Sequence, residues 1–87
     1  MNIHVTFKQL DPSEQLKQYA EKRLKKLSKF CPENENIEAF ITLSVDKYRH
    51  KAEVNLKGKN MHISAIEQSE DLYASIDLVL EKLETQV

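Results

Sequence analysis

The chain has 87 residues, of which 40% are hydrophobic and 31% charged, and its formal net charge is −1. This length accommodates one small domain, and the composition is too apolar for an intrinsically disordered chain. No apolar run approaches the roughly 18 residues that a membrane span requires, and a single cysteine, Cys31, excludes an internal disulfide. We therefore expect one domain over residues 1–87, in a reducing, cytoplasmic compartment and without membrane contact.

The first two predicted elements are a strand and a helix. Residues 2–8 alternate between apolar and polar side chains, as in a half-buried strand. Asp11-Pro12-Ser13-Glu14 then predicts a helix start, with Asp11 as the cap and Glu14 completing a capping box. The helix is expected to end near Phe30, before a turn over residues 31–36. Its apolar arc, which also contains Arg23, consists of Leu16, Tyr19, Ala20, Leu24, Leu27 and Phe30.

Three more alternating runs follow, over residues 37–46, 51–57 and 61–65, and they predict an antiparallel meander. Ser69-Glu70-Asp71 predicts the start of a second helix with a hydroxyl cap. Its buried stripe consists of Leu72, Ile76, Val79, Leu80 and Leu83. The order β-α-β-β-β-α predicts an α+β fold, a four-stranded sheet with two helices packed on one face. The first two strands should be parallel if adjacent, with a right-handed crossover.

Positive charge is concentrated in the predicted first helix. Residues 17–29 hold six basic side chains and one acidic side chain, whereas residues 67–87 hold six acidic side chains and one basic side chain. Acidic partners at i±4 are almost absent from the basic stretch, and long basic side chains on one flank suit the phosphates of a nucleic acid. A solvated helix face is the alternative. The predicted contacts are Lys22, Arg23, Lys25, Lys26 and Lys29.

A second basic stretch lies in the predicted meander, where residues 47–59 hold five basic side chains against one acidic side chain. Arg49 and Lys51 from this stretch, with Lys8 from the first strand, join the predicted contact surface. Tyr48 and His50 alternate with these charges and can stack on bases, although a plain β-turn explains them more simply.

The outward face of the predicted sheet offers one exposed aromatic residue, Phe40, which is too few for the base-stacking sheet of an RNA-recognition motif. Phe40 more simply serves as an edge or contact residue. The side chains expected on this face are His4, Thr6, Lys8, Phe40, Thr42, Ser44, Lys51, Asn55 and Lys57.

No spacing in the sequence argues for an active site. The histidines His4, His50 and His62 are scattered, and Asp71 and Asp77 lie six residues apart, so that their side chains would not converge on one helix face. The sequence has no glycine-rich loop and no zinc-type Cys/His set. We therefore expect a protein that is not an enzyme and has no cofactor, metal or small-molecule substrate.

The segment Ser69 to Asp77 reads SEDLYASID, and Glu81 to Gln86 reads EKLETQ. With Lys51-Ala52-Glu53-Val54, the opening strand and the basic helix, these segments resemble the ribosome hibernation-promoting factor and ribosome-associated inhibitor A family over essentially the whole chain. The resemblance implies a β-α-β-β-β-α fold similar to double-stranded-RNA-binding domains. It also implies binding of the small ribosomal subunit in the channel used by messenger and transfer RNA, near the decoding centre. Ribosomes would thereby be held inactive in stationary phase, starvation or cold.

By position, Arg23, Lys26 and Lys29 match basic positions on the family's first helix, and Lys82 matches the lysine of its C-terminal Lys-Leu-x-Arg-Gln stretch. The chain departs from the pattern at Thr85, where an arginine is usual. Family members also continue this helix with further lysines past the position of residue 87. The resemblance therefore implies a weakened arm of RNA contact, in a short form or the N-terminal domain of a long form.

The expected partner is the small ribosomal subunit, both its rRNA and its proteins, bound by a chain that is monomeric off the ribosome. Tyr73, at the rim of the second helix's apolar stripe, is expected to pack on the core, with RNA contact as the alternative. Two other functions stay open. A generic double-stranded-RNA binder would bind naked duplexes as well as ribosomes. A protein-interaction module, including one that modulates a sigma factor, would use the exposed edge at Phe40.

Overall fold

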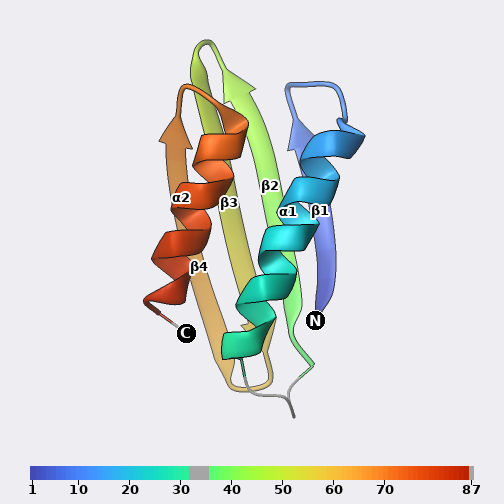
Figure 1. Ribbon diagram of the computed structural model, residues 1–87, viewed down its shortest axis with the longest axis vertical. Helices are drawn as coiled ribbons and strands as arrows, with labels where there is room; N and C mark the ends of the chain where they lie inside the picture. The colour runs from blue at the N-terminus through green and yellow to red at the C-terminus, as the bar shows by residue number, and fades with distance from the viewer. Residues whose placement is uncertain (32–35, 87) are drawn as a thin grey trace.

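The computed structural model describes residues 1–31 and 36–86. Its elements follow the predicted order β-α-β-β-β-α (Figure 1). They are β1 (Asn2–Lys8), α1 (Glu14–Leu27), a 3-10 turn η1 (Ser28–Phe30), β2 (Glu38–Asp46), β3 (Arg49–Gly58), β4 (Met61–Ser69) and α2 (Leu72–Glu84). Most of the turn predicted over residues 31–36 lies outside the described residues.

The four strands form one mixed sheet in the order β1-β2-β3-β4. β1 is parallel to β2, and β2, β3 and β4 form the predicted antiparallel meander. Both helices cover the same face of this sheet, and the other face has no helix over it (Figure 1). We call this second, uncovered side the open face.

The crossover from β1 through α1 to β2 is left-handed, against the predicted right-handed connection. In Figure 1 the helices face the viewer, β1 and β2 point upward, and β2 lies to the left of β1. The apolar side of the strands decides this geometry. The side chains of Val5, Ile41 and Val54 lie in one row and face the core. Helix α1 must therefore cover this side of the sheet together with α2. A right-handed crossover would instead place α1 over the polar side chains of the other side.

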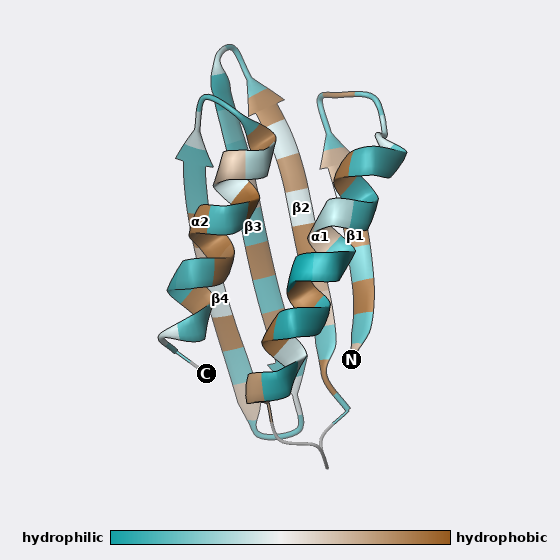
Figure 2. Cartoon of the chain, viewed as in Figure 1, coloured by the Kyte–Doolittle hydropathy of each residue, from teal (hydrophilic) through white to brown (hydrophobic). Residues whose placement is uncertain are grey.

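The core lies between the sheet and the two helices. Brown, hydrophobic bands alternate with polar ones along the strands, as Figure 2 shows. The largest fully buried aliphatic side chains come from α1, β2, β3 and α2, and they are Leu24, Leu27, Ile41, Leu43, Val54, Leu56, Ile76, Val79, Leu80 and Leu83. Burial of this layer supplies the main stabilisation of the fold.

Both predicted helix caps were wrong by two residues. Ser13, and not Asp11, caps α1, because its side-chain oxygen accepts a hydrogen bond from the backbone N–H of Leu16 at 3.2 Å. In α2 the cap is Asp71, whose carboxylate accepts from the N–H of Tyr73 at 3.2 Å. Ser69 is instead the last residue of β4, which extends four residues further than the alternation predicted. In both cases two side chains near the helix start could accept the capping hydrogen bond, and the point at which the preceding strand or turn ends determines which of them does so.

Phe30, predicted in the buried arc of the first helix, is 62% exposed. The α-helix ends at Leu27, and Figure 1 shows α1 and η1 extending past the last turn of α2. Phe30 has the helical spacing of Arg23, which contacts α2, but the described turns of α2 (Leu72–Glu84) do not reach η1, where Phe30 lies. The core continues instead through Cys31, which is buried.

Candidate nucleic-acid interface

The solvent side of α1 and η1 carries five lysines, Lys17, Lys22, Lys25, Lys26 and Lys29, which together we call the lysine face. The opposite side of the helix is buried through Leu16, Ala20, Leu24 and Leu27. All five lysines are exposed. Within residues 1–31 and 36–86 none of them takes part in an ion pair. Their ammonium groups are therefore available to an anionic partner, which is what phosphate contacts require.

Arg23 lies on the flank of α1 that packs against α2. Its Nε lies 3.2 Å from Oδ1 of Asp77, an ionic contact in which the N–H is not aligned for a hydrogen bond. Tyr19, one turn earlier, donates its hydroxyl to the same oxygen at 2.6 Å. The hydrogen bond to this carboxylate, with burial as a further cause, raises the pKa of Tyr19. Arg23 therefore connects the two helices, and its guanidinium is partly committed within the protein.

Tyr73 belongs to the same contact between the helices. Its ring meets the ring of Tyr19 edge-on, with 5.1 Å between the ring centroids and an interplanar angle of 72°. Tyr73 is 38% exposed, so part of its ring packs and part faces solvent. The expected packing role is present, although it is against α1 at the surface and not within the buried core.

Lys82, the predicted contact on α2, lies away from the lysine face. Its Nζ is 3.3 Å from Oε2 of Glu67 on β4, the edge strand furthest from β1. On the helical wheel Lys82 lies on the flank of α2 opposite Asp77, the residue that contacts α1. The body of α2 therefore separates Lys82 from the lysines of α1.

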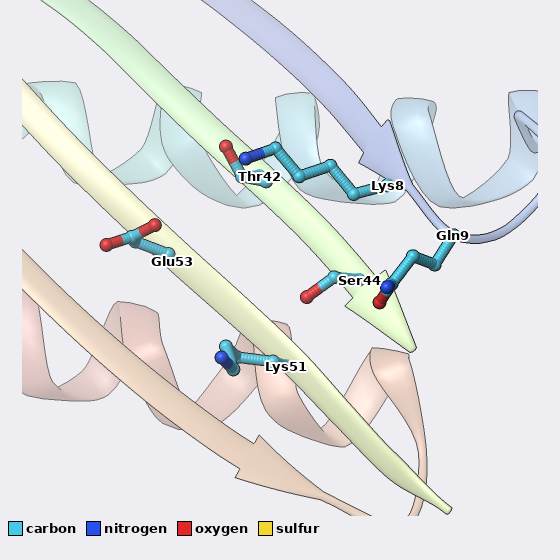
Figure 3. Close-up of a pocket in the computed structure, with 6 residues that line it drawn as sticks. All are labelled: Lys8, Gln9, Thr42, Ser44, Lys51 and Glu53. Atoms are coloured by element: carbon cyan, nitrogen blue, oxygen red, sulfur yellow. The ribbon is translucent and has the colours of Figure 1, made fainter. Parts of the chain in front are cut away.

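The remaining predicted contacts lie on the open face. Strand register places Lys8, Ser44, Lys51 and Gln68 in one row across the four strands. Arg49 pairs with Asp46 in the adjoining position. Figure 3 shows Lys8 and Lys51 beside Gln9, Thr42, Ser44 and Glu53, around a hollow on the side turned away from the helices.

The β2–β3 hairpin ends in a two-residue turn, Lys47-Tyr48, in which Lys47 takes a left-handed backbone conformation with φ 60°. Tyr48 is 79% exposed, and Nδ1 of His50 lies 3.3 Å from the carbonyl oxygen of Tyr48. Figure 1 places this hairpin at the end of the molecule opposite the C-terminal end of α1. Tyr48 and His50 are thus remote from Lys25, Lys26 and Lys29.

The nine predicted contacts therefore do not form one patch. Lys22, Lys25, Lys26 and Lys29 lie together, Arg23 and Lys82 are in ion pairs on different flanks of α2, and Lys8, Arg49 and Lys51 are on the far side of the sheet. The sequence pattern placed most of these residues in the right element, but Arg49, expected in the turn before residue 51, is the first residue of β3, and Lys29 lies in η1 after the α-helix has ended. It also did not reveal that two faces of the molecule are involved.

Sequence reasoning missed a pair of stacked rings on the open face. His4 and Phe40 were both expected there, but not in contact. Their ring centroids are 4.8 Å apart with an interplanar angle of 15°. Only the register of β1 against β2, in which His4 pairs with Phe40, brings them together, and alternation alone does not give that register.

The described ranges contain no cluster of three or more His, Cys, Asp or Glu side chains with the arrangement of a metal site. In the same ranges no helix is long and apolar enough to cross a membrane.

Comparison with known proteins identifies the family. Residues 3–87 match the model of the family described as sigma 54 modulation protein / S30EA ribosomal protein. The chain belongs to this family. Among S30EA-family relatives, a ribosome hibernation promotion factor of Lactococcus lactis is 32% identical over 88 aligned residues, covering 100% of this chain and 48% of the relative. A ribosome hibernation promoting factor of Azotobacter vinelandii is 29% identical and is covered to 79%. The chain thus spans about half the length of the first relative.

Solved structures share the S30EA-family fold described above. The N-terminal domain of Thermus thermophilus Protein Y superimposes with a TM-score of 0.88 at 29% identity, covering 99% of this chain and 94% of that domain. A ribosomal subunit interface protein from Coxiella burnetii gives a TM-score of 0.88 at 30% identity, with 99% and 92% coverage. These likenesses confirm the four-stranded sheet with two helices on one face.

Proposed function

We propose that this chain is a ribosome hibernation factor that binds the small ribosomal subunit, in the channel of messenger and transfer RNA near the decoding centre, and inhibits translation under stress or in stationary phase. Relatives named as ribosome hibernation factors and a structural neighbour named as a ribosomal subunit interface protein support this proposal. The observation in this chain that carries it is the lysine face, five exposed lysines that form no ion pair with any residue in 1–31 or 36–86.

The domain would inhibit translation by occupying the channel of messenger and transfer RNA, without catalysing a reaction. Residues 1–87 act as one binding domain in the cytoplasm, and the lysine face contacts rRNA phosphates, whose attraction is strong and independent of sequence. Shape complementarity then fixes the position of the domain. A domain lodged in a channel meets RNA on more than one side, which accounts for basic residues on both the helical side and the open face.

The acidic helix has a place in this arrangement. Asp77 is occupied by Tyr19 and Arg23, and Glu67 by Lys82. The exposed carboxylates Glu81 and Glu84 remain on α2, so we expect this part of α2 to face away from RNA or toward a basic ribosomal protein.

The proposal is tested by co-sedimentation with separated small and large subunits, at low and moderate salt, with a naked RNA duplex as competitor. We compare the wild type with the variant Lys22→Gln, Lys25→Gln, Lys26→Gln and Lys29→Gln. Arg23 is kept, because its loss would also leave Asp77 without an ionic partner. The neutralised chain should bind the small subunit at least tenfold more weakly at moderate salt, with a shallower salt dependence, because each lost phosphate contact removes about 0.7–0.9 from the logarithmic slope.

The matched control replaces the same four lysines with arginine, which keeps the charge and should keep binding within a few-fold. Circular dichroism should show that both variants fold as the wild type does, since the four side chains are exposed. Equal affinity of the glutamine variant and the wild type across the salt series would remove the lysine face from the binding surface.

The other functions give different results in the same experiment. Loss of pelleting to the naked duplex would indicate a generic duplex-RNA binder. Failure to pellet with either subunit, at any salt, would contradict the ribosomal role of these 87 residues and favour a protein partner, such as the sigma factor in the family's description.

A further inference from the structure

The open face of the sheet is a polar platform with one aromatic column. Strand register arranges it in rows across β1, β2, β3 and β4. The successive rows are Lys8–Ser44–Lys51–Gln68, Thr6–Thr42–Glu53–Ile66, His4–Phe40–Asn55–Ser64 and Asn2–Glu38–Lys57–His62. Phe40, 37% exposed, and Ile66, 45% exposed, are the large apolar side chains of these rows.

The aromatic column is built from three neighbouring strands. Phe40 on β2 has the His4 ring stacked against it from β1, at 4.8 Å between centroids and nearly parallel. From the β3 side, the Nζ of Lys57 lies over the Phe40 ring, 5.6 Å from its centroid. Lys57, Phe40 and His4 therefore follow one another across the sheet, and His4 is the member nearest the edge.

The His4 ring is held in this orientation. Its Nε2 lies 2.7 Å from Oε2 of Glu38, and Asn2 donates its side-chain N–H to the other oxygen of the same carboxylate at 3.2 Å. β1 is an edge strand that pairs with β2 alone in the described structure, and the His4 side chain is 52% exposed. A flat group can therefore extend the column at His4 without displacing a strand.

The chemistry of this platform favours a nucleobase over a protein surface. Protein-binding patches gain their affinity from a desolvated, largely apolar centre, whereas here hydroxyl and amide side chains surround two separated apolar groups. Stacked rings with a cation beside them are instead the surface on which unpaired bases stack. Lys8 lies four residues beyond His4 on β1, about 13 Å away along the strand, within reach of the backbone of the same nucleic-acid strand.

Acidic groups on the face set limits on where phosphates can lie. The two oxygens of Glu38 are engaged by His4 and Asn2, but Glu53 stands between Lys51 and Asn55 on β3 and has no such partner within the row. Phosphates are therefore expected near Lys57, at one end of the column, and near Lys8, further along β1 from His4, and not over the centre of β3.

We propose that the open face binds an unpaired base of single-stranded RNA, which stacks on His4 as the next member of the Lys57–Phe40–His4 column. The proposal adds a second contact to the proposed function, on which it rests in taking rRNA as the source of that base. The stack, and not a hydrogen bond to the base edge, supplies the affinity, so the site should tolerate any base.

The test titrates the wild-type chain with a short single-stranded oligoadenylate and follows the ring protons of His4 and Phe40 by NMR. The variants are His4→Ala, which removes the outer ring, and His4→Phe, which keeps a ring but loses the hydrogen bond to Glu38. Ile66→Ala is the matched control, an exposed apolar residue of the same face outside the column. Affinities are measured for oligoadenylate by fluorescence anisotropy and for the small ribosomal subunit by co-sedimentation.

We expect the His4 and Phe40 ring signals to shift on titration, and His4→Ala to weaken both affinities by about 5- to 100-fold, the loss of one base stack. The affinities of His4→Phe and Ile66→Ala should stay within about twofold of the wild type, because His4→Phe keeps a ring on which a base can stack and Ile66 lies outside the column. Ring signals that do not move, or a His4→Ala chain that binds oligoadenylate like the wild type, would overturn the proposal. Weaker subunit binding with unchanged oligoadenylate binding would also overturn it, in favour of a ribosomal protein on this face.

These outcomes are separable from those of the proposed function. A chain that pellets with the small subunit through its lysine face but shows no ring shifts keeps the ribosomal role and loses the base site. A chain that binds oligoadenylate through His4 but pellets with neither subunit keeps the base site and loses the ribosomal role.

Discussion

Glu38 and Asp77 each hold two side chains from a segment that is distant in the sequence. Asp77 accepts from Tyr19 and contacts Arg23, residues more than fifty positions earlier. Glu38 accepts from Asn2 and lies against His4, across the parallel pair of β1 and β2. Single carboxylates thereby position groups at both candidate surfaces, the flank of α1 and the aromatic column of the open face.

The pKa of Glu38 tests the contact with His4. Hydrogen bonding from His4, and secondarily from Asn2, holds this pKa below the ordinary value of a glutamate. The amino terminus lowers it further, and Lys57 pairs with Glu38 on the neighbouring strand. We expect His4→Phe to return the pKa of Glu38 toward its ordinary value of about 4.3, which NMR titration of the side-chain carboxyl carbon measures.

The sign of the effect on stability follows from the direction of the shift. Because the pKa of Glu38 is lower in the folded chain, the carboxylate stabilises the fold above the unfolded pKa, and this contribution is lost as pH falls through the folded pKa. Acid unfolding should therefore depend less steeply on pH below about 4.3 in His4→Phe than in the wild type. An unchanged carboxyl titration in the variant would show that the His4 contact does not persist in solution.

At the scale of elements, the junction of β4 and α2 shows a chain of hydroxyl groups that no periodicity predicts. The N–H of Asp71 donates to Oγ of Ser69 at 3.2 Å, and the hydroxyls of Ser69 and Ser75 are 2.7 Å apart. Ser75, which is fully buried, donates to the carbonyl oxygen of His50 at 2.5 Å. These bonds fasten the start of α2 to the first residues of β3.

Ser75→Ala should therefore destabilise the chain by about 1–3 kcal/mol, because the part-buried carbonyl of His50 loses the hydroxyl that donates to it and Ser69 loses one of its hydroxyl contacts. Urea unfolding at neutral pH measures the difference. Ser64→Ala on the open face is the matched control, because Ser64 is exposed, and it should change stability by less than about 0.5 kcal/mol. Equal stability of the two variants would show that the hydroxyl chain contributes nothing to the fold.

The elements themselves were predictable because periodicity reports which side of each one is buried. Alternation gave β1 with its bounds, and the 3.6-residue pattern gave α1 and α2. The caps were not predictable, because Asp11 and Ser13 are both competent and tertiary geometry chooses between them. Strand register was not predictable either, so the contact of His4 with Phe40 was missed.

At the scale of the whole molecule, charge alone suggested one basic surface, and the fold divides it between two. The crossover through α1 decides this division, because it places the lysine face over the buried side of the sheet and leaves Lys8 and Lys51 on the open face. The molecule is 40 Å long and 18 Å thick, so a channel that encloses its thin dimension can contact both faces at once.

This arrangement predicts that the two faces contribute to ribosome binding independently. We compare three variants: the double variant Lys22→Gln and Lys26→Gln on α1, the double variant Lys8→Gln and Lys51→Gln on the open face, and the variant that combines all four substitutions. The two pairs lie on opposite sides of a molecule 18 Å thick and share no contact, so their losses in binding free energy should add to within about 0.5 kcal/mol. Affinity for the small subunit at several salt concentrations measures all three. If Lys8→Gln with Lys51→Gln binds like the wild type, a single face carries the contact, and the RNA must then approach from the side of the helices alone.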